Sequence, residues 1–435
     1  MIDIDSILDN LTSDNLVIPF GKVTNINATT ITGDGLEVAI GDIVIVESIK
    51  GSSSTFGIVA SMDNHNFTIV PFGFIEGFKI NDRIRLHKEG LSVRVGYGLS
   101  GRVVNALGSP IDGKGNLENL EANYPINKIA MSPLERTTIE EPFYTGVKSI
   151  DSMLTCGKGQ KMGIFAGSGV GKSTLMGMIV KGSVAQIKVV ALIGERGREI
   201  PEFIKFNLGD DLTNTIIVAA TSDESPLMRK YGAFTAMAIA EFFRDKGHDV
   251  LLIMDSVTRF AMAQREIGLS TNEPPVSRGY PPSVFSLLPQ LMERAGANRT
   301  GTITAFFTVL VDGDDMSDPI ADQSRSILDG HIVLNRELTE SGLYPPIDIL
   351  QSASRVIDKV TSPEHLNIAL KLKRILSLIK ENEILVRVGA YKEGIDKELD
   401  NALAKKEQVM EFLGQKTDEI LTFEKIFEKF RVILN

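Results

Sequence analysis

The chain has 435 residues, of which 43% are hydrophobic and 23% charged, so it is long enough for about three globular domains. Its net charge of −10 argues against a broad basic surface for nucleic acid. Its single cysteine, Cys156, excludes an intramolecular disulfide and fits a reducing compartment. Because it has neither a basic-then-apolar leader nor an apolar run of membrane length, we expect a soluble cytoplasmic protein.

Residues 1–18 are predicted to form an N-terminal partner-binding segment. Ile4, Ile7, Leu8 and Leu11 fall on one face of a helix at this spacing. Such a face suits either a helix that binds a partner or a segment that packs locally, and the sequence leaves both open.

Residues 19–90 are predicted to form a small β-barrel domain. Short β-branched segments such as LEVAIGDIVIVES, TFGIVASM and NFTIVPFG alternate with turns at the spacing of an antiparallel barrel. Phe72, Phe74 and Phe78 are interpreted as barrel core. The alternative is an aromatic platform for nucleic acid, which would need a basic pattern beside it that this region lacks.

Residues 91–345 alternate apolar strands with helical segments, which predicts an α/β domain around a mainly parallel sheet. The predicted strands are KMGIFAG, KVVALIG, TIIVAAT, VLLIMDS and TITAFFTVL. Helix formers dominate residues 346–435, which are predicted to form a C-terminal helical domain. In its last helix an apolar stripe is expected to pack on this same domain: Ile420, Phe423, Phe427, Phe430 and Leu434.

The stretch AGSGVGKST, residues 166–174, lies between a strand-like and a helix-like segment, which is the context of a P-loop. Ala166 stands where the strict motif has glycine. Backbone N–H groups and the helix N-terminus would bind phosphate there. Lys172 would contact the β and γ phosphates, and the Ser173 hydroxyl would contact Mg²⁺. The predicted nucleotide-binding set is Gly167, Ser168, Gly169, Val170, Gly171, Lys172, Ser173 and Thr174.

Two carboxylates follow apolar runs further along the chain. Asp255 ends VLLIMD and is predicted to lie near the metal. Glu195 follows the apolar run that leads into LIGERGREI, residues 192–200. Taken alone, that charged stretch is typical of a solvated loop. With a P-loop in the same sheet, Glu195 is instead predicted to orient and polarise the water that attacks the γ-phosphate.

Six motifs, in this order, resemble those of the type III secretion ATPases, and most closely their flagellar export branch, which are relatives of the rotary F- and V-type subunits. The motifs are FAGSGVGKSTL, IGERGREIPEF, DSVTRFAMAQREIGL, EPPVSRGYPPSVFSLLPQLMERAG, DDMSDPIADQSRSILDGHIVL and YPPIDILQSASRV. The resemblance covers nearly the whole chain. It implies a RecA-like P-loop NTPase core between the barrel and the helical domain, and a ring of six identical subunits with ATP between neighbours. It also implies that DGDDMSDP, residues 312–319, faces the central pore.

The resemblance implies roles for further residues. Lys172 and Glu195 would be catalytic. Arg259 would approach the γ-phosphate, and Arg355 would be an arginine finger that reaches the site of the neighbouring subunit. Tyr344 would stack on adenine, whereas without the resemblance it would be interpreted as a packed loop aromatic.

The other charged residues of LIGERGREI are expected to have structural roles. Arg196 is expected to help position the charged loop. Arg198 and Glu199 are expected to brace this loop or to contact the neighbouring subunit.

The function implied is Mg²⁺-dependent ATP hydrolysis by a homohexamer that energises flagellar protein export, including unfolding of substrates or their release from chaperones. The implied partners are a regulator at the N-terminal segment, a coiled-coil stalk in the ring, export chaperones with substrates, and the export gate at the inner membrane. No nucleic acid is expected, and the location would be cytoplasmic and peripheral to that membrane.

Three alternatives stay open. The first is a virulence-type (injectisome) secretion ATPase, which would carry the same motifs. The second is a non-catalytic subunit of a rotary ATPase, which the presence of Glu195 disfavours. The third is a ring-shaped RNA translocase, which the acidic balance of the chain disfavours.

Overall fold

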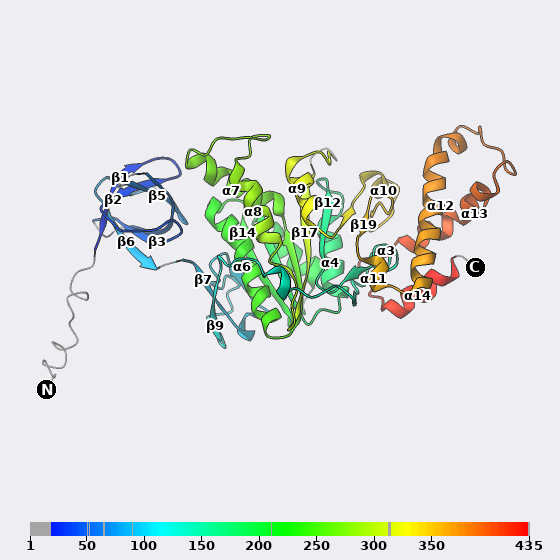
Figure 1. Ribbon diagram of the computed structural model, residues 1–435, viewed down its shortest axis with the longest axis horizontal. Helices are drawn as coiled ribbons and strands as arrows, with labels where there is room; N and C mark the ends of the chain where they lie inside the picture. Colours follow the sequence, from blue (N-terminus) through cyan, green and yellow to red (C-terminus); the bar gives the residue numbers. More distant parts are fainter. Residues whose placement is uncertain are drawn as a thin grey trace.

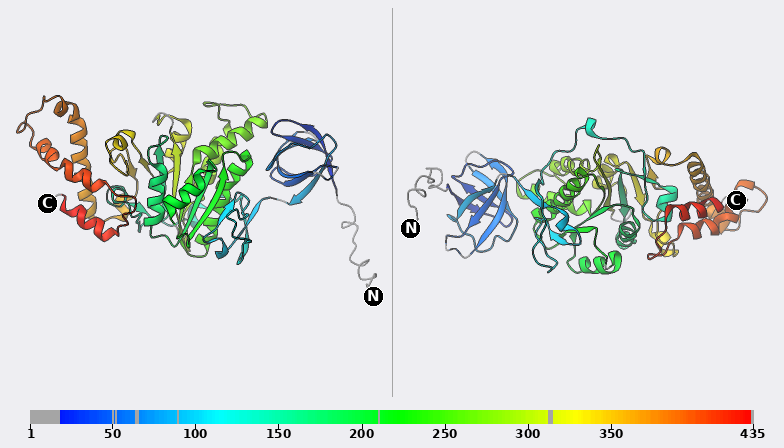
Figure 2. Two further views of the ribbon diagram at one scale, coloured as in Figure 1. Left: turned by 180° about the vertical axis from the view of Figure 1, so that it is seen from behind. Right: turned by 90° about the horizontal axis from the view of Figure 1, so that it is seen from below.

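The computed structural model describes residues 19–49, 51, 53–63, 66–88, 90–209, 211–311 and 315–433. The predicted partner-binding segment 1–18, residues 312–314 of the predicted pore loop, and Leu434 lie outside the described residues. Three parts follow one another along the long axis (Figures 1 and 2). A barrel lies at one end, an α/β domain in the middle, and a group of helices at the other end.

The first part is a closed antiparallel barrel, as predicted, with the strand order β1-β2-β5-β4-β3-β6. Its strands are β1 (Gly21–Ile26), β2 (Ile31–Asp34), β3 (Ile43–Glu47), β4 (Ser54–Asp63), β5 (Asn66–Pro71) and β6 (Arg83–Lys88). Alternate apolar side chains fill the interior, because successive residues of a strand point to opposite faces. Closure pairs every strand on both sides, so this small domain has no open edge.

The three phenylalanines of this region have different environments. Phe78 packs against the barrel interior, in agreement with the prediction. Phe72 is buried, but it packs against Tyr231 at the junction with the central domain. The prediction is wrong for Phe74, which is 81% exposed because it lies in the turn after β5, outside the alternation of the strands.

The central sheet has the strand order β19-β18-β12-β17-β15-β13-β14-β8, with β16 paired to β17. Its strands are β8 (Val103–Asn105), β12 (Lys161–Ala166), β13 (Ile187–Glu195), β14 (Thr215–Thr221), β15 (Asp249–Asp255), β16 (Gly296–Ala297), β17 (Thr302–Leu310), β18 (Gly330–Val333) and β19 (Ala353–Ser354). All pairs are parallel except those made by β16 and β19. The five predicted strands are confirmed, whereas β8, β16, β18 and β19 were not predicted. The sheet continues past residue 345 to β19.

Helices cover both faces of this sheet, which explains why its strands are continuously apolar. In β13, Val189, Ala191 and Ile193 belong to one core, which includes α6 (Pro226–Asp245), α7 (Val257–Ser270) and α8 (Pro282–Met292). Val190 and Leu192 point to the opposite core, which includes α4 (Lys172–Gly182) and the C-terminal helices. The parallel arrangement brings the carboxyl ends of the strands to a common edge.

The last part of the chain is helical, as predicted. Its main helices are α12 (Pro363–Arg387), α13 (Lys397–Leu413) and α14 (Phe423–Val432). Phe423, Phe427 and Phe430 lie against His365 of α12, and Phe423 also stacks on Tyr144 at 4.1 Å between ring centroids. The stripe therefore packs on the central part as well as on its own domain. Ile420 departs from the prediction: it precedes α14 and is 64% exposed.

Shorter elements connect these parts. They are β7 (Ser92–Val95) paired with β9 (Ala122–Pro125), β10 (Pro142–Phe143) paired with β11 (Cys156–Gly157), η1 (Tyr97–Leu99), η2 (Pro133–Glu135), α3 (Lys148–Met153), α5 (Glu199–Glu202), η3 (Phe203–Leu208), α9 (Pro319–Ile327), α10 (Arg336–Glu340) and α11 (Ile357–Val360). Among the described residues, no helix is both long and apolar enough to span a membrane.

A buried ion pair ties helix α6 to the segment after α8. The guanidinium of Arg294 donates to both carboxylate oxygens of Glu241 at 3.0 and 2.7 Å, and to the carbonyl of Ile126 at 2.6 Å. Both side chains are almost fully buried. Their fixed, two-pronged geometry makes this pair a strong structural constraint on the central domain.

We predict that Glu241→Ala destabilises the protein by about 3–5 kcal/mol, because it leaves the buried Arg294 guanidinium without its counter-charge. The measurement is the urea denaturation midpoint of the full chain. The control is Glu398→Ala, which removes an exposed two-pronged pair with Arg374 and should leave the midpoint nearly unchanged. Equal shifts for the two variants would contradict the prediction.

Candidate nucleotide-binding and catalytic site

The predicted phosphate loop connects the end of β12, at Ala166, to the start of α4, at Lys172. Gly169 and Gly171 have φ angles of 75° and 104°, which side-chain-bearing residues rarely adopt. These two residues let the backbone curve tightly before the helix begins. The loop therefore places the positive N-terminal end of α4, together with its free backbone N–H groups, at the carboxyl edge of the sheet.

Lys172 lies between the two predicted carboxylates. Its ammonium group forms an ion pair with Asp255 and lies 3.5 Å from Glu195 Oε1. Asp255 is almost fully buried and accepts a hydrogen bond from Thr308 Oγ1 at 2.6 Å. Because β13 ends at Glu195 and β15 ends at Asp255, the structure brings together three residues that the sequence separates widely.

The environment of Glu195 opposes its ionisation. Burial is the largest cause that raises the pKa of this carboxyl group, whereas the ammonium of Lys172 lowers it. The charge of Asp255 raises the pKa again, and so does a hydrogen bond with Glu199 from the first turn of α5. Glu199 thus contacts the proposed catalytic carboxylate within its own chain, which the sequence did not indicate. Because two carboxylates face one ammonium, the cluster has an excess of negative charge that a further cation would balance.

Arg259 lies in the first turn of α7, close behind Asp255. Its side chain packs across Gly194, where an added Cβ would lie only 2.8 Å from the Cβ of Arg259. The Nε atom of Arg259 is buried and has no hydrogen-bond partner in the described part of the chain. An unsatisfied cationic donor beside the end of β13 agrees with a role in binding an anion.

Two other predicted site residues lie apart from the Lys172 cluster. Arg355 is exposed after the edge strand β19, and its guanidinium donates to the carbonyl of Arg325 at 3.4 Å. Tyr344 is partly exposed in the loop after α10, and its carbonyl accepts a hydrogen bond from the backbone N–H of Gln415. Arg196 is largely exposed, and its guanidinium lies 3.6 Å from the carboxylate of Glu199, so its role in positioning the charged loop stays a prediction.

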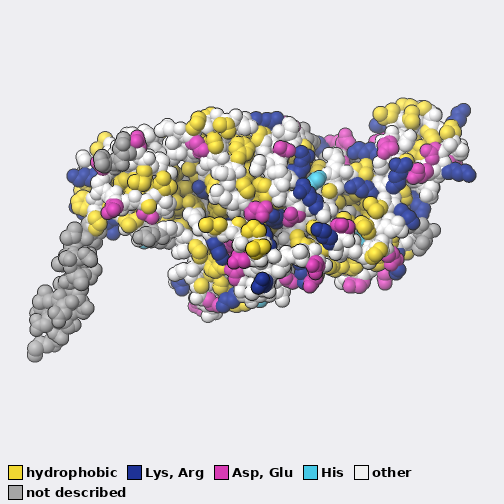
Figure 3. Space-filling view, in the orientation of Figure 1, with side chains coloured by type: hydrophobic (Ala, Val, Ile, Leu, Met, Phe, Trp, Pro, Cys, Tyr) yellow, Lys and Arg dark blue, Asp and Glu magenta, His cyan; other side chains and the backbone are white. Residues whose placement is uncertain are grey.

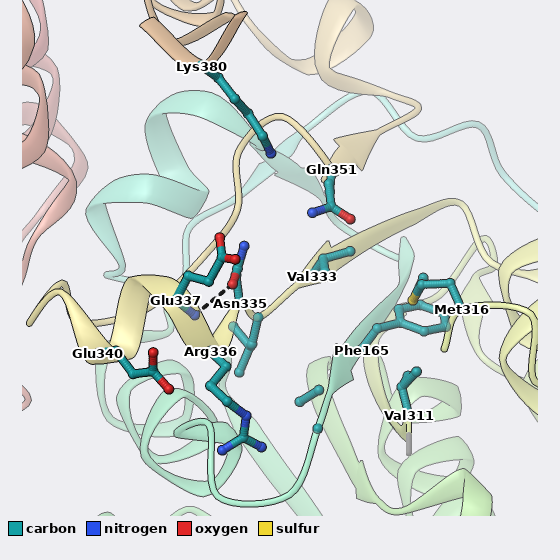
Figure 4. Close-up of a pocket in the computed structure, with 13 residues that line it drawn as sticks. Phe165, Val311, Met316, Val333, Asn335, Arg336, Glu337, Glu340, Gln351 and Lys380 are labelled. Carbon is teal, nitrogen blue, oxygen red and sulfur yellow. Dashed lines mark hydrogen bonds between the residues drawn. The ribbon is translucent and has the colours of Figure 1, made fainter. Parts of the chain in front are cut away.

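Sequence reasoning missed residues that hold the phosphate loop from outside. The guanidinium of Arg336 donates to the carbonyl of Ser168 at 2.8 Å, and Thr339 Oγ1 donates to the carbonyl of Val170 at 3.3 Å. Arg336 also borders a cavity of about 480 Å³ beside the loop, into which Lys380 of α12 projects (Figure 4). The available signal was Asn335, an N-cap residue that directly follows the apolar run HIVL.

A magnesium ion at this site would depend on the nucleotide. The described residues contain no group of three or more His, Cys, Asp or Glu side chains arranged to hold a metal. Mg²⁺ is commonly held by one or two protein ligands plus substrate phosphates, and Ser173 and Asp255 are suited to that arrangement. The only cysteine of the chain is buried, and burial raises the pKa of its thiol, so Cys156 is not a reactive nucleophile.

Comparison with known proteins agrees with this geometry. The model of the ATP synthase alpha/beta family nucleotide-binding domain matches residues 146–354, and that of the T3SS EscN ATPase C-terminal domain matches residues 361–431. A flagellum-specific ATP synthase of Helicobacter pylori is 57% identical over 95% of both chains. A type 3 secretion system ATPase of Xanthomonas euvesicatoria is 44% identical over 94% of this chain and 92% of the relative.

A solved structure extends the likeness to the whole fold. It is that of the assembled ATPase EscN in complex with its central stalk EscO, from the type III secretion system of enteropathogenic E. coli. It is 43% identical, with a TM-score of 0.89, and covers 95% of this chain and 100% of the other. The fold and the phosphate loop define a nucleotide-binding ATPase of the ATP synthase alpha/beta class. Within that class, the chain belongs to the family of flagellar and type III secretion ATPases.

We predict that Glu199→Gln shifts the acidic limb of the pH profile of kcat/KM for ATP hydrolysis to lower pH. As the predicted base, Glu195 can draw a proton from the attacking water only when it is ionised, so the rate is expected to fall as the pH drops through its pKa. Glu199 raises that pKa, and the substitution removes its charge, so Glu195 stays ionised to lower pH. The control is Glu202→Gln, at an exposed position of the same helix. An acidic limb that does not move would contradict the prediction.

Proposed function

We propose that this chain hydrolyses ATP with Mg²⁺ in a homohexameric ring and that the ring energises flagellar type III protein export. The observation that carries the proposal is the placement of Lys172 against Asp255 and Glu195 beside a phosphate loop. Phosphoryl transfer to water requires a cation that binds phosphate, a carboxylate near the metal and a second carboxylate that orients the water. The cluster contains one of each.

The residues present fit both ATP and Mg²⁺. The loop of residues 167–174 would hold the phosphates, with the Lys172 ammonium exchanging part of its contact with the carboxylates for the phosphates. Ser173 and Asp255 would hold Mg²⁺, which when bound neutralises charge on the β and γ oxygens. Glu195 would orient the attacking water, and Arg259, with its unpaired buried Nε, would contact the γ-phosphate. Tyr344 would pack on the adenine.

The position of Arg355 supports a ring. This arginine is exposed at the β19 edge and does not join the Lys172 cluster, so it is available to the site of a neighbouring subunit. There it would stabilise charge developing on the transferred phosphoryl group. The solved EscN structure is that of an assembled ATPase, which supports a ring for this chain as well.

The stalk is proposed to contact the tip of the α12–α13 hairpin. Ile384, Val388 and Ile395 are exposed there, and hydrophobic side chains gather at this end of the molecule (Figure 3). Exposed apolar patches of this kind mark protein contacts. EscN was solved in complex with its central stalk EscO, which supports a stalk as the partner.

The remaining partners and the location stay proposals that rest on the family. They are a regulator at residues 1–18, export chaperones with their substrates, and the export gate, with the ring at the cytoplasmic face of the inner membrane and no nucleic acid involved. The flagellar assignment is preferred because the flagellar relative is 57% identical and the virulence-type relative 44%.

We predict that Glu195→Gln binds ATP normally but loses at least about 99% of its turnover, because the amide cannot polarise water as the carboxylate does. Binding is measured with a fluorescent nucleotide on the full chain, and turnover by phosphate release. In cells that lack the gene, the wild-type chain should restore flagellar filaments and Glu195→Gln should not. Normal turnover by the variant would refute the role of Glu195. Loss of injected effectors rather than filaments on deletion would refute the flagellar assignment.

We predict that Arg355→Ala and Lys172→Ala are each inactive alone but regain turnover when mixed. Rings formed from equal amounts would hold about a quarter of their sites with an intact phosphate loop from one subunit and an intact Arg355 from the next. The control mixture is Glu195→Gln with Lys172→Ala. It should stay inactive because both side chains serve the site of their own subunit. Absence of recovery in the first mixture, with rings shown to exchange subunits, would contradict action between subunits.

A further inference from the structure

Residues 335–346, which we call the α10 bridge, connect the phosphate loop to the helical domain. The segment contains α10 and Tyr344 and is closed on itself, because the N–H of Asn335 donates to the carbonyl of Pro346 at 2.9 Å. Inside it, the N–H of Leu343 donates to the carbonyl of Leu338 at 2.9 Å. The α10 bridge is therefore a compact unit that would move as one piece.

At one end, the α10 bridge holds the outer face of the phosphate loop. Arg336 and Thr339 donate to the carbonyls of Ser168 and Val170. Figure 4 shows Arg336 reaching from α10 toward the loop that follows β12. Both side chains bond carbonyl oxygens of the loop, so the effect that these two bonds have on a ligand is indirect.

Peptide geometry gives that indirect effect a direction. The carbonyl of Ser168 and the N–H of Gly169 belong to one planar trans peptide and point to opposite sides. When Arg336 fixes the carbonyl outward, the N–H of Gly169 is fixed inward, toward the phosphate site. A charge-assisted hydrogen bond also polarises the peptide and makes its N–H a better donor. The single proton of the Thr339 hydroxyl is shared between the carbonyls of Val170, at 3.3 Å, and Asn335, at 3.4 Å, so its similar effect on the N–H of Gly171 is the weaker of the two.

At the other end, the α10 bridge is held by Gln415, directly after α13. The backbone N–H of Gln415 donates to the carbonyl of Tyr344 at 2.6 Å. Its buried side chain accepts from the N–H of Lys148 at 2.7 Å and donates to the carbonyls of Gly146 and Glu419, each at 2.8 Å. With these contacts the side chain anchors the end of α13 to the start of α3.

We propose that the α10 bridge couples the position of the helical domain to the affinity of the phosphate loop for ATP, with Arg336 and Gln415 as positioning residues at its two ends. The inference rests on the proposed function, because it assumes that ATP phosphates bind inside the loop. A shift of α13 would move Gln415 and Tyr344, turn α10, and change the aim of the Gly169 and Gly171 N–H groups. A partner bound to the helical domain would thereby change ATP affinity, and ATP would change the affinity for that partner equally.

The first test compares Arg336→Ala, Arg336→Lys and the control Arg299→Ala in the full chain. Arg299 is an exposed arginine away from the loop. Arg336→Ala should raise the KM for ATP about tenfold or more, which corresponds to the loss of a charged hydrogen bond, and lower kcat less. Arg336→Lys, which keeps a cationic donor, should restore part of the KM. The exposed position should leave the melting temperature unchanged in all three variants. A normal KM in Arg336→Ala would overturn the proposal.

The second test is a double-mutant cycle between Arg336→Ala and Gln415→Ala, with Gln408→Ala, an exposed glutamine of α13, as the matched control. Gln415→Ala keeps the backbone N–H that bonds Tyr344 but removes the side-chain contacts that fix its position. If one bridge joins both ends, Arg336→Ala should therefore raise KM much less in the Gln415→Ala background than in the wild type. It should have its full effect beside Gln408→Ala. If the fold-change in KM of the double variant equals the product of the two single-variant fold-changes to within about twofold, the two sites are independent and the proposal is overturned.

A second substitution and a parallel measurement separate failure of the bridge from misfolding of the variant and from failure of the proposed function. If Gln415→Ala does not fold, Gln415→Glu is used, because it keeps the acceptor for Lys148 and removes both donors. Turnover by the wild-type chain and by Lys172→Ala is measured in parallel. If the wild-type chain does not turn over ATP, or if Lys172→Ala turns it over normally, the proposed function is refuted. If the wild-type chain is active, Lys172→Ala is not, and the KM effects of the two substitutions multiply, only the bridge is refuted.

Discussion

The ion pair of Lys172 with Asp255, close to Glu195, is the constraint on which the site depends. It exists because β12, β13 and β15 run parallel, so the residues that follow their carboxyl ends meet at one edge. Leu192 pairs with Asp255 in the register of β13 and β15, which sets Glu195 beyond Asp255 at that edge. Reversing any of these strands would move its functional residue to the opposite edge. The continuous apolar runs produce a buried parallel sheet, and the parallel order of its strands is the reason that Lys172, Glu195 and Asp255 lie together.

The same arrangement supports the proposal that a single chain supplies only part of the site. Lys172 serves two carboxylates at once, and burial raises the pKa of Glu195 beside it. Further positive charge is needed when phosphates enter, and within the described part of the chain Arg259 stands close behind. Arg355 lies at the β19 edge, on the far side of β12 from β13 and β15. Under the proposed function, the exposed arginine that follows this edge strand contacts a phosphate only when another subunit lies against it, so catalysis would require assembly.

Much of this could be predicted from sequence because the signals are local. The phosphate loop is a contiguous motif, and Glu195 and Asp255 each end an apolar run. Strands β16 and β19 have two residues each and β8 has three, too short for any periodic pattern, so they were missed. Arg336 bonds Ser168 and Gln415 bonds Gly146, partners that are far away in the chain, and no local pattern encodes such pairs. Phe74 was misplaced because hydrophobicity alone does not tell a turn from the strand before it.

The phosphate loop needs support from outside because of the residues that give it its shape. Gly169 and Gly171 adopt positive φ angles that permit the tight turn, but glycine also has the most backbone freedom to lose on ordering. A loop left to itself would therefore lose that freedom each time a phosphate binds, at a cost in binding free energy. Contacts to its carbonyls remove the freedom beforehand without occupying the N–H groups. An arginine is well suited to this, because its charge is permanent and its planar group can bond a carbonyl while remaining partly solvated. Gly169 and Gly171 therefore determine the shape of the loop, whereas Arg336 of α10 restricts its backbone motion before a phosphate binds.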